Sequence, residues 1–211
     1  MRFLILGFGK FGRLSLKRLL AVGSEVSIII VDSNEQALIG SFPKSVEVIQ
    51  SEAITFLTRY RDIDSQDIIL PLVPLHVAAG YLLARIPGAS LTSLPNMLSQ
   101  IVPQPFLIGD FNLCCSRADF ICPDDCPEGD LCTVTGLPRH PLYEDLEALI
   151  VPGFTVRVLR SRQILPGLGG YSFRELQQLV SSMSAGKYLI ATACKCHGIL
   201  TSLAIPKSVV R

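Results

Sequence analysis

The feature that most constrains the fold of this 211-residue chain is a run of glycines directly after its first apolar segment. Residues 2–6 (RFLIL) have the continuous apolar character of a strand buried in a parallel sheet. Residues 7–12 (GFGKFG) follow the pattern G-x-G-x-x-G, and residues 11–23 have the apolar spacing of a helix that stops at Gly23. This order predicts the opening of a Rossmann-type βαβ unit.

Each glycine of the pattern has a physical role in holding a dinucleotide. Gly7 allows a tight turn, Gly9 lets the backbone approach a pyrophosphate, and Gly12 lets the helix pack closely against the strand. The free amide donors at the start of the helix then face the phosphates. The predicted cofactor-binding residues are Gly7, Phe8, Gly9, Lys10, Phe11, Gly12, Asp32 and Ser33.

Asp32 closes a second predicted strand, residues 25–31 (EVSIIIV), and lies 20 residues after Gly12. A carboxylate at this point accepts hydrogen bonds from both hydroxyls of the adenosine ribose and repels a 2′-phosphate. The sequence therefore favours NAD(H) over NADP(H). The alternative is that Asp32 only caps a helix that begins near Asn34.

Strands and helices continue to alternate after Asp32. We expect strands at 46–49 and 67–72 and helices at 52–60 and 76–85. The predicted fold class is therefore α/β, with a Rossmann-like doubly wound parallel sheet in a domain that spans residues 1–105.

The apolar run at residues 68–84 (IILPLVPLHVAAGYLLA) has the hydropathy of a membrane span. Pro71, Pro74 and His76 interrupt it, so we expect a buried strand and a buried helix, and a chain that is not itself membrane-spanning. We expect His76, at the start of that helix, at the solvent edge or packed against the nucleotide.

Residues 106–211 are predicted to form a second, smaller α+β domain that contains all seven cysteines. The glycine-rich stretch at 166–170 is expected to be a tight turn, with a second anion site as the alternative. Ser172 and Glu175 fit a capping box at the start of a helix. The expected elements are strands at 106–110, 154–165 and 187–193 and a helix at 173–183.

Five of the cysteines are candidates for one metal centre. Three lie in segment 122–132, where a proline after each of the first two cysteines excludes a regular helix and leaves a loop able to curl around an ion. We expect the strand at 187–193 to continue, so that Cys194 and Cys196 share one face and His197 takes the other. The predicted ligands are Cys122, Cys126, Cys132, Cys194 and Cys196.

Thiolates suit both an iron–sulfur cluster, which we favour, and zinc. Two alternatives need no metal: the cysteines are core residues in the late strand and incidental in the loop, or they form a redox dithiol or a sensing thiol. Cys114 and Cys115 are expected in the same irregular segment as the loop cysteines.

The net charge and the cysteine content limit the range of partners and of cellular compartments that we expect. Nineteen basic and eighteen acidic residues give a net charge of +1 without a basic stripe, so we expect no nucleic-acid partner. We expect no secretion signal at the N-terminus, and seven cysteines without an export signal predict a reducing, cytoplasmic location.

The stretch LGFGKFGRLSLKRLLAVGSEVSIIIVDSNEQAL, residues 6–38, resembles the TrkA-N (RCK N-terminal) NAD-binding domains of potassium-uptake regulators. The resemblance covers about residues 1–86. It implies a regulatory module that binds NAD(H) or another adenine nucleotide through the three glycines and Asp32. It also implies a homodimer or a membrane-transporter partner. The chain has Ser51-Glu52-Ala53 where such domains have Gly-Asp-Ala, so Glu52 takes the place of their acid.

Three functions follow from these features. The first, which we favour, is an NAD(H)-binding regulatory or sensor protein with a cysteine-ligated metal centre. The second is a small NAD-dependent oxidoreductase that passes electrons between the nicotinamide and a cluster or dithiol. The third is a nucleotide-binding subunit with a zinc-stapled structural domain. No pair of carboxylates or Ser-His-Asp set with catalytic spacing marks the chain as an enzyme.

Overall fold

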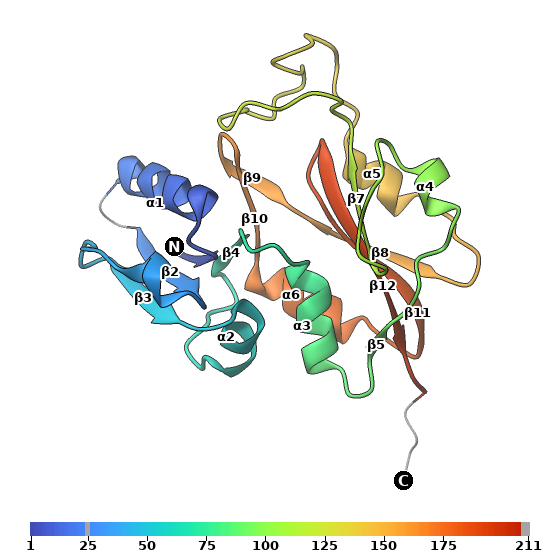
Figure 1. Cartoon of the computed structure of the whole chain (residues 1–211), viewed down its shortest axis with the longest axis horizontal. Helices are drawn as coiled ribbons and strands as arrows, with labels where there is room; N and C mark the ends of the chain where they lie inside the picture. Colours follow the sequence, from blue (N-terminus) through green and yellow to red (C-terminus); the bar gives the residue numbers. More distant parts are fainter. Residues whose placement is uncertain (24–25, 208–211) are drawn as a thin grey trace.

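The computed structural model describes residues 1–23 and 26–207 as a mixed α/β protein with two sheets (Figure 1). The first sheet has the order β3-β2-β1-β4-β10-β9, and its first four strands are parallel. These strands are β1 (Arg2–Leu6), β2 (Ser27–Asp32), β3 (Val46–Gln50) and β4 (Ile68–Pro71). The first residue of the predicted strand at 25–31, Glu25, lies outside the described residues.

Helices cover both faces of these parallel strands. Alternate residues of β1 and β2 pack on one face against α1 (Lys10–Val22). The residues between them pack on the other face against α2 (Ala53–Arg59) and α3 (Val77–Arg85). The apolar runs at residues 3–6 of β1 and 28–31 of β2 therefore bury both faces of the sheet. A short 3-10 helix, η1 (Glu35–Leu38), follows β2.

The predicted doubly wound parallel sheet is not confirmed as such, because two antiparallel strands from the second half complete it. They are β9 (Arg162–Leu165) and β10 (Leu168–Ser172), and β10 pairs with β4. The expected tight turn at 166–170 is therefore limited to Pro166 and Gly167. Gly170 belongs to the strand, where a Cβ would lie 2.5 Å from the carbonyl oxygen of Ile69.

The second sheet has the order β6-β7-β12-β11-β8, with β5 beside β12. Only the pair β8 and β11 is parallel. Its strands are β5 (Ser90–Leu91), β6 (Phe106–Ile108), β7 (Asn112–Ser116), β8 (Thr155–Arg160), β11 (Gly186–Ala193) and β12 (His197–Ile205). Helices α4 (Leu98–Ile101), α5 (Leu142–Glu147) and α6 (Phe173–Ser181) accompany them.

The chain passes from one sheet to the other at Ser161. The single strand predicted at 154–165 is two strands, because β8 ends in the second sheet and β9 belongs to the first. The predicted capping box of α6 is confirmed: the Ser172 hydroxyl accepts from the Glu175 amide, and the Glu175 carboxylate accepts from Ser172. One buried cluster includes residues of both sheets, such as Leu4 and Ile190.

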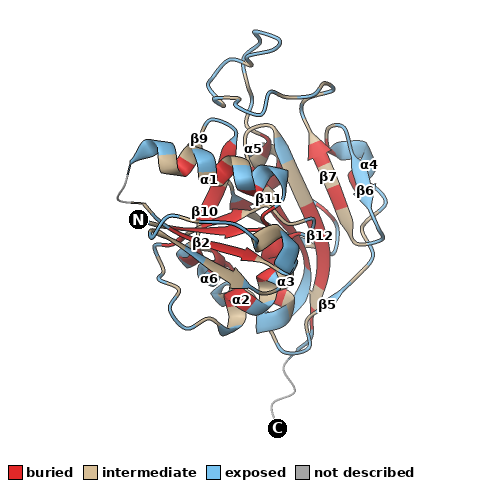
Figure 2. Ribbon diagram, turned by 60° about the vertical axis from the view of Figure 1, so that its left-hand side comes forward, coloured by how far each residue is buried: buried red, intermediate tan, exposed pale blue. Residues whose placement is uncertain are grey.

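The apolar run at 68–84 forms β4 and α3, as expected, and its buried residues include Ile69 and Leu70 of β4 and residues 77–79, Tyr81 and Leu82 of α3 (Figure 2). Among the helices of residues 1–23 and 26–207, none is both long enough and apolar enough to cross a membrane.

His76 is buried, contrary to the position expected for it. It precedes α3, its ring is 7% exposed, and its two nitrogens lie 2.7 Å and 2.8 Å from the hydroxyl oxygens of Thr201 and Thr192. The Thr201 hydroxyl donates to the side-chain oxygen of Asn112, so it accepts from the Nδ1–H of His76. The Thr192 hydroxyl then donates to Nε2. The ring is thus a neutral link between α3 and the second sheet.

The first prediction follows from this burial, which lowers the pKa of His76 to about 3. Because the folded state excludes the charged ring and the unfolded state does not, the stabilisation is complete above pH 6.5 and is lost as the pH falls toward 3. The free energy of unfolding should decrease by up to about 1.4 kcal/mol per pH unit from this group alone. Urea unfolding between pH 7.5 and 4.5 measures the decrease.

A His76→Gln variant should therefore approach the wild-type stability as the pH falls. His140→Gln serves as the control, because the side chain of His140 is exposed. A difference between wild type and His76→Gln that stays constant across this pH range would contradict the prediction.

Candidate functional site

The turn between β1 and α1 has the geometry that its glycines predict. Gly7 has a φ of +98°, and a Cβ there would lie 2.7 Å from the carbonyl oxygen of Leu72. A Cβ on Gly12 would lie 2.2 Å from the carbonyl oxygen of Gly7. A Cβ on Gly9, in contrast, would have no heavy atom within 4 Å. Gly7 and Gly12 thus permit close backbone packing, while Gly9 faces open space.

The first turn of α1 presents uncapped amide donors beside this open space. Gly9 is the N-cap residue and supplies no side-chain acceptor, and the first turn has no acidic residue. The partial positive charge of the helix N-terminus is therefore not offset by a residue of the turn itself. Such an end attracts an anionic group.

Asp32 connects the end of β2 to the glycine turn. Its Oδ2 accepts from the amide of Phe8 at 2.6 Å, and its Oδ1 accepts from the amide of Asn34 at 2.8 Å. Both oxygens therefore have a structural partner, and each retains acceptor capacity for a ligand hydroxyl. Ser33 is exposed beside it, and the amide of Ser51 donates to the Asp32 carbonyl oxygen.

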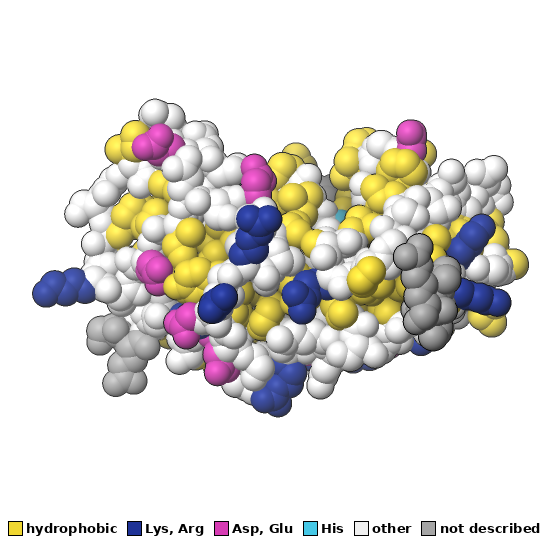
Figure 3. Space-filling model, turned by 90° about the horizontal axis from the view of Figure 1, so that it is seen from below, with side chains coloured by type: hydrophobic (Ala, Val, Ile, Leu, Met, Phe, Trp, Pro, Cys, Tyr) yellow, Lys and Arg dark blue, Asp and Glu magenta, His cyan; other side chains and the backbone are white. Residues whose placement is uncertain are grey.

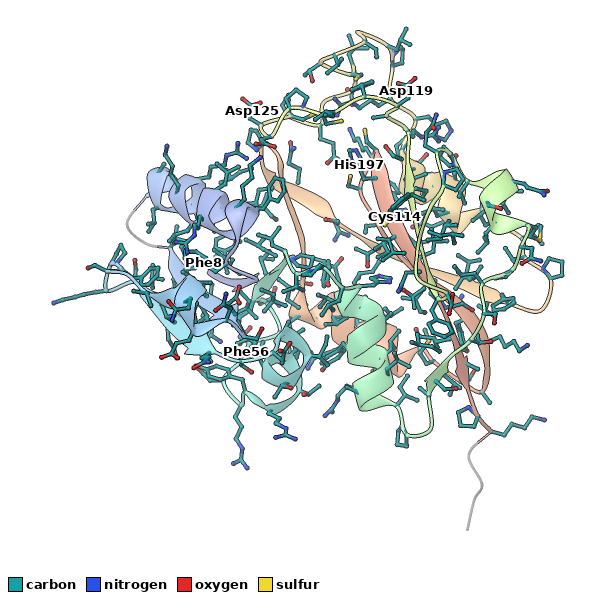
Figure 4. All side chains as sticks on the ribbon, viewed as in Figure 1. Phe8, Phe56, Cys114, Asp119, Asp125 and His197 are labelled. Atoms are coloured by element: carbon teal, nitrogen blue, oxygen red, sulfur yellow. The ribbon has the colours of Figure 1, made fainter. Side chains whose placement is uncertain are left out.

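The cysteines of the loop lie around a cavity of about 920 Å³. This loop, residues 117–141, leaves β7 and returns to α5, and it stands above the two sheets in Figure 1. Figure 4 shows Asp119 and Asp125 on the loop and His197 below it. All five predicted ligands line the cavity: Cys122, Cys126, Cys132, Cys194 and Cys196.

The same cavity reaches the first sheet. Phe11, in the first turn of α1, and Pro71, at the end of β4, line its opposite side. Two predicted groups of residues that are far apart in sequence, the glycine turn and the cysteines, therefore approach one cavity.

The late cysteines lie in a turn, so the prediction that a strand continues through them is wrong. β11 ends at Ala193 and β12 begins at His197, and the amide of Cys194 donates to the carbonyl oxygen of His197 at 2.9 Å. The Cys194 sulfur accepts from the amides of Cys196 and His197, both at 3.4 Å. The three-residue connection 194–196 therefore directs Cys194 and Cys196 to the cavity.

The two remaining cysteines are also placed differently from the expectation. Cys114 and Cys115 belong to β7, where Cys115 is buried in the core of the second sheet. Burial raises the pKa of the Cys115 thiol to about 12, which is the behaviour of an inert structural cysteine.

Donors surround two of the loop cysteines. Burial raises the pKa of Cys126, but the amide of Glu128 and the guanidinium of Arg139 outweigh it, so the pKa lies below its usual value. The Thr135 hydroxyl, followed by the amides of Thr135 and Val134, lowers the pKa of Cys132 to about 7. Turns that direct donors at sulfur stabilise thiolates, the form that binds metals.

Arg139 lies among these thiols with part of its hydrogen-bonding capacity unused. Its Nη2 donates to the Cys126 sulfur at 3.1 Å. Its Nε and Nη1 are buried, and no atom of the described residues accepts a hydrogen bond from them. A buried guanidinium N–H without an acceptor is costly, so these donors indicate room for an anionic group.

Two strained residues line the same cavity. Gln104 and Glu128 have φ values of +42° and +48°, and they are the only non-glycine residues of the described chain with positive φ. Glu128 is held there by a hydrogen bond of 2.8 Å from the amide of Lys195. Such strain concentrates at binding sites.

The cysteines are not arranged as a finished metal site. Within the described residues, no three His, Cys, Asp or Glu side chains form a group that could hold one ion. His197 lies between two of the thiols, with its Nε2 3.8 Å from the Cys122 sulfur and its Nδ1 4.0 Å from the Cys194 sulfur. Binding a metal would therefore require the loop side chains to move together.

Comparisons with known proteins assign the chain to a protein family. Residues 78–206 match the family model AF_1314_C, described as "Uncharacterized protein, C-terminal domain". A protein of Archaeoglobus fulgidus, described as "Uncharacterized protein", is 30% identical over 186 residues, which cover 85% of this chain and 81% of that protein. No solved structure matches the chain significantly.

The second prediction tests the glycine turn as a packing element. Gly12→Ala should lower the free energy of unfolding by about 1–3 kcal/mol, because the new Cβ meets the Gly7 carbonyl oxygen. Gly9→Ala is the matched control and should cost less than about 1 kcal/mol, since its Cβ points into open space. Equal losses for the two variants in chemical denaturation would show that the turn is not closely packed.

Proposed function

Within the AF_1314_C family, to which this chain belongs, we propose that the protein is an NAD(H)-binding regulatory or sensor protein with a cysteine-ligated metal centre. The nucleotide site we propose is a Rossmann-type site formed by the turn after β1, the N-terminus of α1 and Asp32. The centre we propose lies in the cavity under the loop of residues 117–141.

The division of roles among the glycines supports the nucleotide site. Gly7 and Gly12 are required by packing, but packing does not require Gly9. A glycine that faces open space directly before uncapped helix amides suits the close approach of a pyrophosphate. Asp32, the residue that closes β2, would suit hydrogen bonds to the adenosine ribose and repulsion of a 2′-phosphate.

The observation that carries the metal centre is Arg139. A guanidinium with two buried and unpaired N–H donors, beside the Cys126 sulfur, lacks an anionic partner. A zinc ion or iron–sulfur cluster bound by four thiolates has net negative charge and supplies that partner. When bound, such a centre would give the loop a structural staple or a redox-active group.

Four of the five cavity cysteines fit best as ligands. Cys122, Cys126 and Cys132 come from the loop, and Cys122 and Cys126 lie near enough to Cys196 to influence its ionisation. The Cys194 sulfur instead accepts two amides of its own turn. We therefore assign the fourth position to Cys196 and give Cys194 the role of fixing the turn.

A second candidate function is a small NAD-dependent oxidoreductase. It is favoured by the cavity, since Phe11 and Pro71 on one side and the cysteines on the other enclose space enough for a small substrate. A zinc-stapled nucleotide-binding subunit is the third candidate. An absorption spectrum of protein purified without oxygen separates these candidates, because iron–sulfur clusters absorb visible light and zinc does not.

The proposed setting follows from the same features. The resemblance of residues 1–86 to TrkA-N domains supports a cytoplasmic module whose partner is a second copy of the chain or a membrane transporter. Lysine and arginine side chains are scattered over the face shown in Figure 3 rather than gathered in one patch, which favours no nucleic-acid partner.

The third prediction concerns the nucleotide. Wild-type protein should bind NADH in calorimetry, and Gly9→Val should abolish binding because the side chain occupies the space of the pyrophosphate. NADPH should bind more weakly than NADH, since Asp32 repels its 2′-phosphate. Unchanged NADH affinity in a folded Gly9→Val protein would refute the assignment of the site.

The fourth prediction concerns the centre. Protein purified without oxygen and without chelators should contain zinc or iron near stoichiometric amounts. Cys122→Ser with Cys126→Ser should remove the metal, because two of four ligands are lost, and the variant should still bind NADH. Cys115→Ser is the control for a cysteine outside the cavity, and it should retain metal. Wild-type protein without either metal would refute the centre in favour of thiol chemistry.

A further inference from the structure

We propose that the nucleotide regulates the cysteine centre through Asp124, because its pyrophosphate competes with the Asp124 carboxylate for Lys10. This inference rests on the proposed function and adds a direct connection between its two sites. Binding of NAD(H) at the glycine turn should loosen the loop that carries Cys122 and Cys126. Conversely, metal bound in the loop should weaken the binding of NAD(H).

The connection begins at the glycine pattern itself. Lys10 is the first residue of α1, and its Nζ forms an ion pair with Oδ2 of Asp124 at 3.0 Å. Asp124 lies midway between Cys122 and Cys126 in the sequence. One side chain from the proposed phosphate-binding turn thus holds the centre of the proposed metal-binding segment.

Three further contacts hold the segment of residues 122–126 in place. Nη1 of Arg18, on α1, donates to the carbonyl oxygens of Asp124 and Pro166, both at 2.8 Å. The carbonyl oxygen of Cys126 accepts from the Gly167 amide and from Nε2 of Gln163, also at 2.8 Å. The approach at Gly167 is so close that a Cβ there would lie 1.8 Å from the Asp124 carbonyl oxygen.

We expect an anion bound at the start of α1 to affect these contacts differently. The contacts of the Asp124 and Cys126 carbonyl oxygens involve acceptors without net charge, so we expect an anion at α1 to change them little. The ion pair between Lys10 and Asp124 should change, because a pyrophosphate at the start of α1 carries about two negative charges next to Lys10. It attracts the ammonium and repels the Asp124 carboxylate. The ion pair is exposed, so losing it costs little free energy. Its loss should change the affinity for metal and the affinity for NAD(H) by about two- to fivefold each.

Coupling of this kind acts in both directions. If bound NAD(H) lowers the affinity of the loop for metal, bound metal lowers the affinity for NAD(H) by the same factor. The structure thereby makes the metal centre sensitive to nucleotide occupancy without requiring the nicotinamide to touch a cysteine.

The fifth prediction uses the full chain purified with its metal. Transfer of metal to a chelator should be about two- to fivefold more favourable with saturating NADH than without it. Asp124→Asn should remove this effect and should bind NADH about two- to fivefold more tightly than wild type, because Lys10 is released and the repulsion is gone. Calorimetry of metal-loaded and metal-free wild type measures the reciprocal effect.

Asp125→Asn is the matched control. It removes the same charge one residue away, and Asp125 has no ion pair among residues 1–23 and 26–207. It should keep the wild-type response to NADH. The inference is overturned, and the proposed function stands, if wild type binds both NADH and metal but its metal affinity is the same with and without NADH. The same conclusion follows if Asp125→Asn abolishes the response to NADH as fully as Asp124→Asn. Wild type that binds neither NADH nor metal overturns both.

Discussion

The antiparallel pairing of β10 with β4 is the contact on which the rest of the structure depends. It places Tyr171 opposite Ile69 and extends the sheet that begins with the glycine turn. Gly170 makes the pairing possible, because any side chain would meet the backbone of β4. Once β10 is fixed there, the turn before it lies beside α1, where Arg18 reaches it. The cysteine loop rests on that turn, and the cavity forms between the loop, α1 and the second sheet.

The same pairing makes the two halves of the chain interdependent. The polypeptide leaves the second sheet at Ser161, contributes two strands to the first sheet, and then returns through α6 to β11. His76 adds a buried polar link at the start of α3, with threonine partners on β11 and β12. A ligand that acts on α1 therefore acts on an element whose neighbours extend to the cysteines, without any separate hinge.

The sequence predicts the first half well because its signals are local. A buried strand, the glycine pattern and an amphipathic helix are adjacent in the chain, so short-range sterics determine β1, the turn and α1. The sequence predicts the second half less well because its decisive contacts are long-range. Gly169 and Gly170 suggest a turn by composition, but they enter a strand because Gly169 pairs with β9 and Gly170 lies against β4. The turn at Cys194 contains no glycine or asparagine from which it could be predicted. The burial of His76 depends on strands more than 100 residues away in the sequence.

The cysteine loop shows why regulation is possible at this place in the fold. Residues 117–141 have little regular structure and are almost all exposed or half-buried (Figure 2), so apolar burial contributes little to their position. A few polar contacts hold them instead: Asp124 with Lys10, Glu128 with the Lys195 amide, and Asp130 with the Lys195 ammonium. Exposed ion pairs contribute about 0.2–1 kcal/mol each, so the loop lies at the low-stability end of the molecule. Its cysteines line a cavity with the half-buried Arg139, two of whose nitrogens have no acceptor among the described residues, and this suits the anionic centre proposed above. The position of the loop therefore depends on small electrostatic contributions, and the pyrophosphate proposed to bind at the start of α1 would place its charge next to one of them, the ion pair of Lys10 and Asp124.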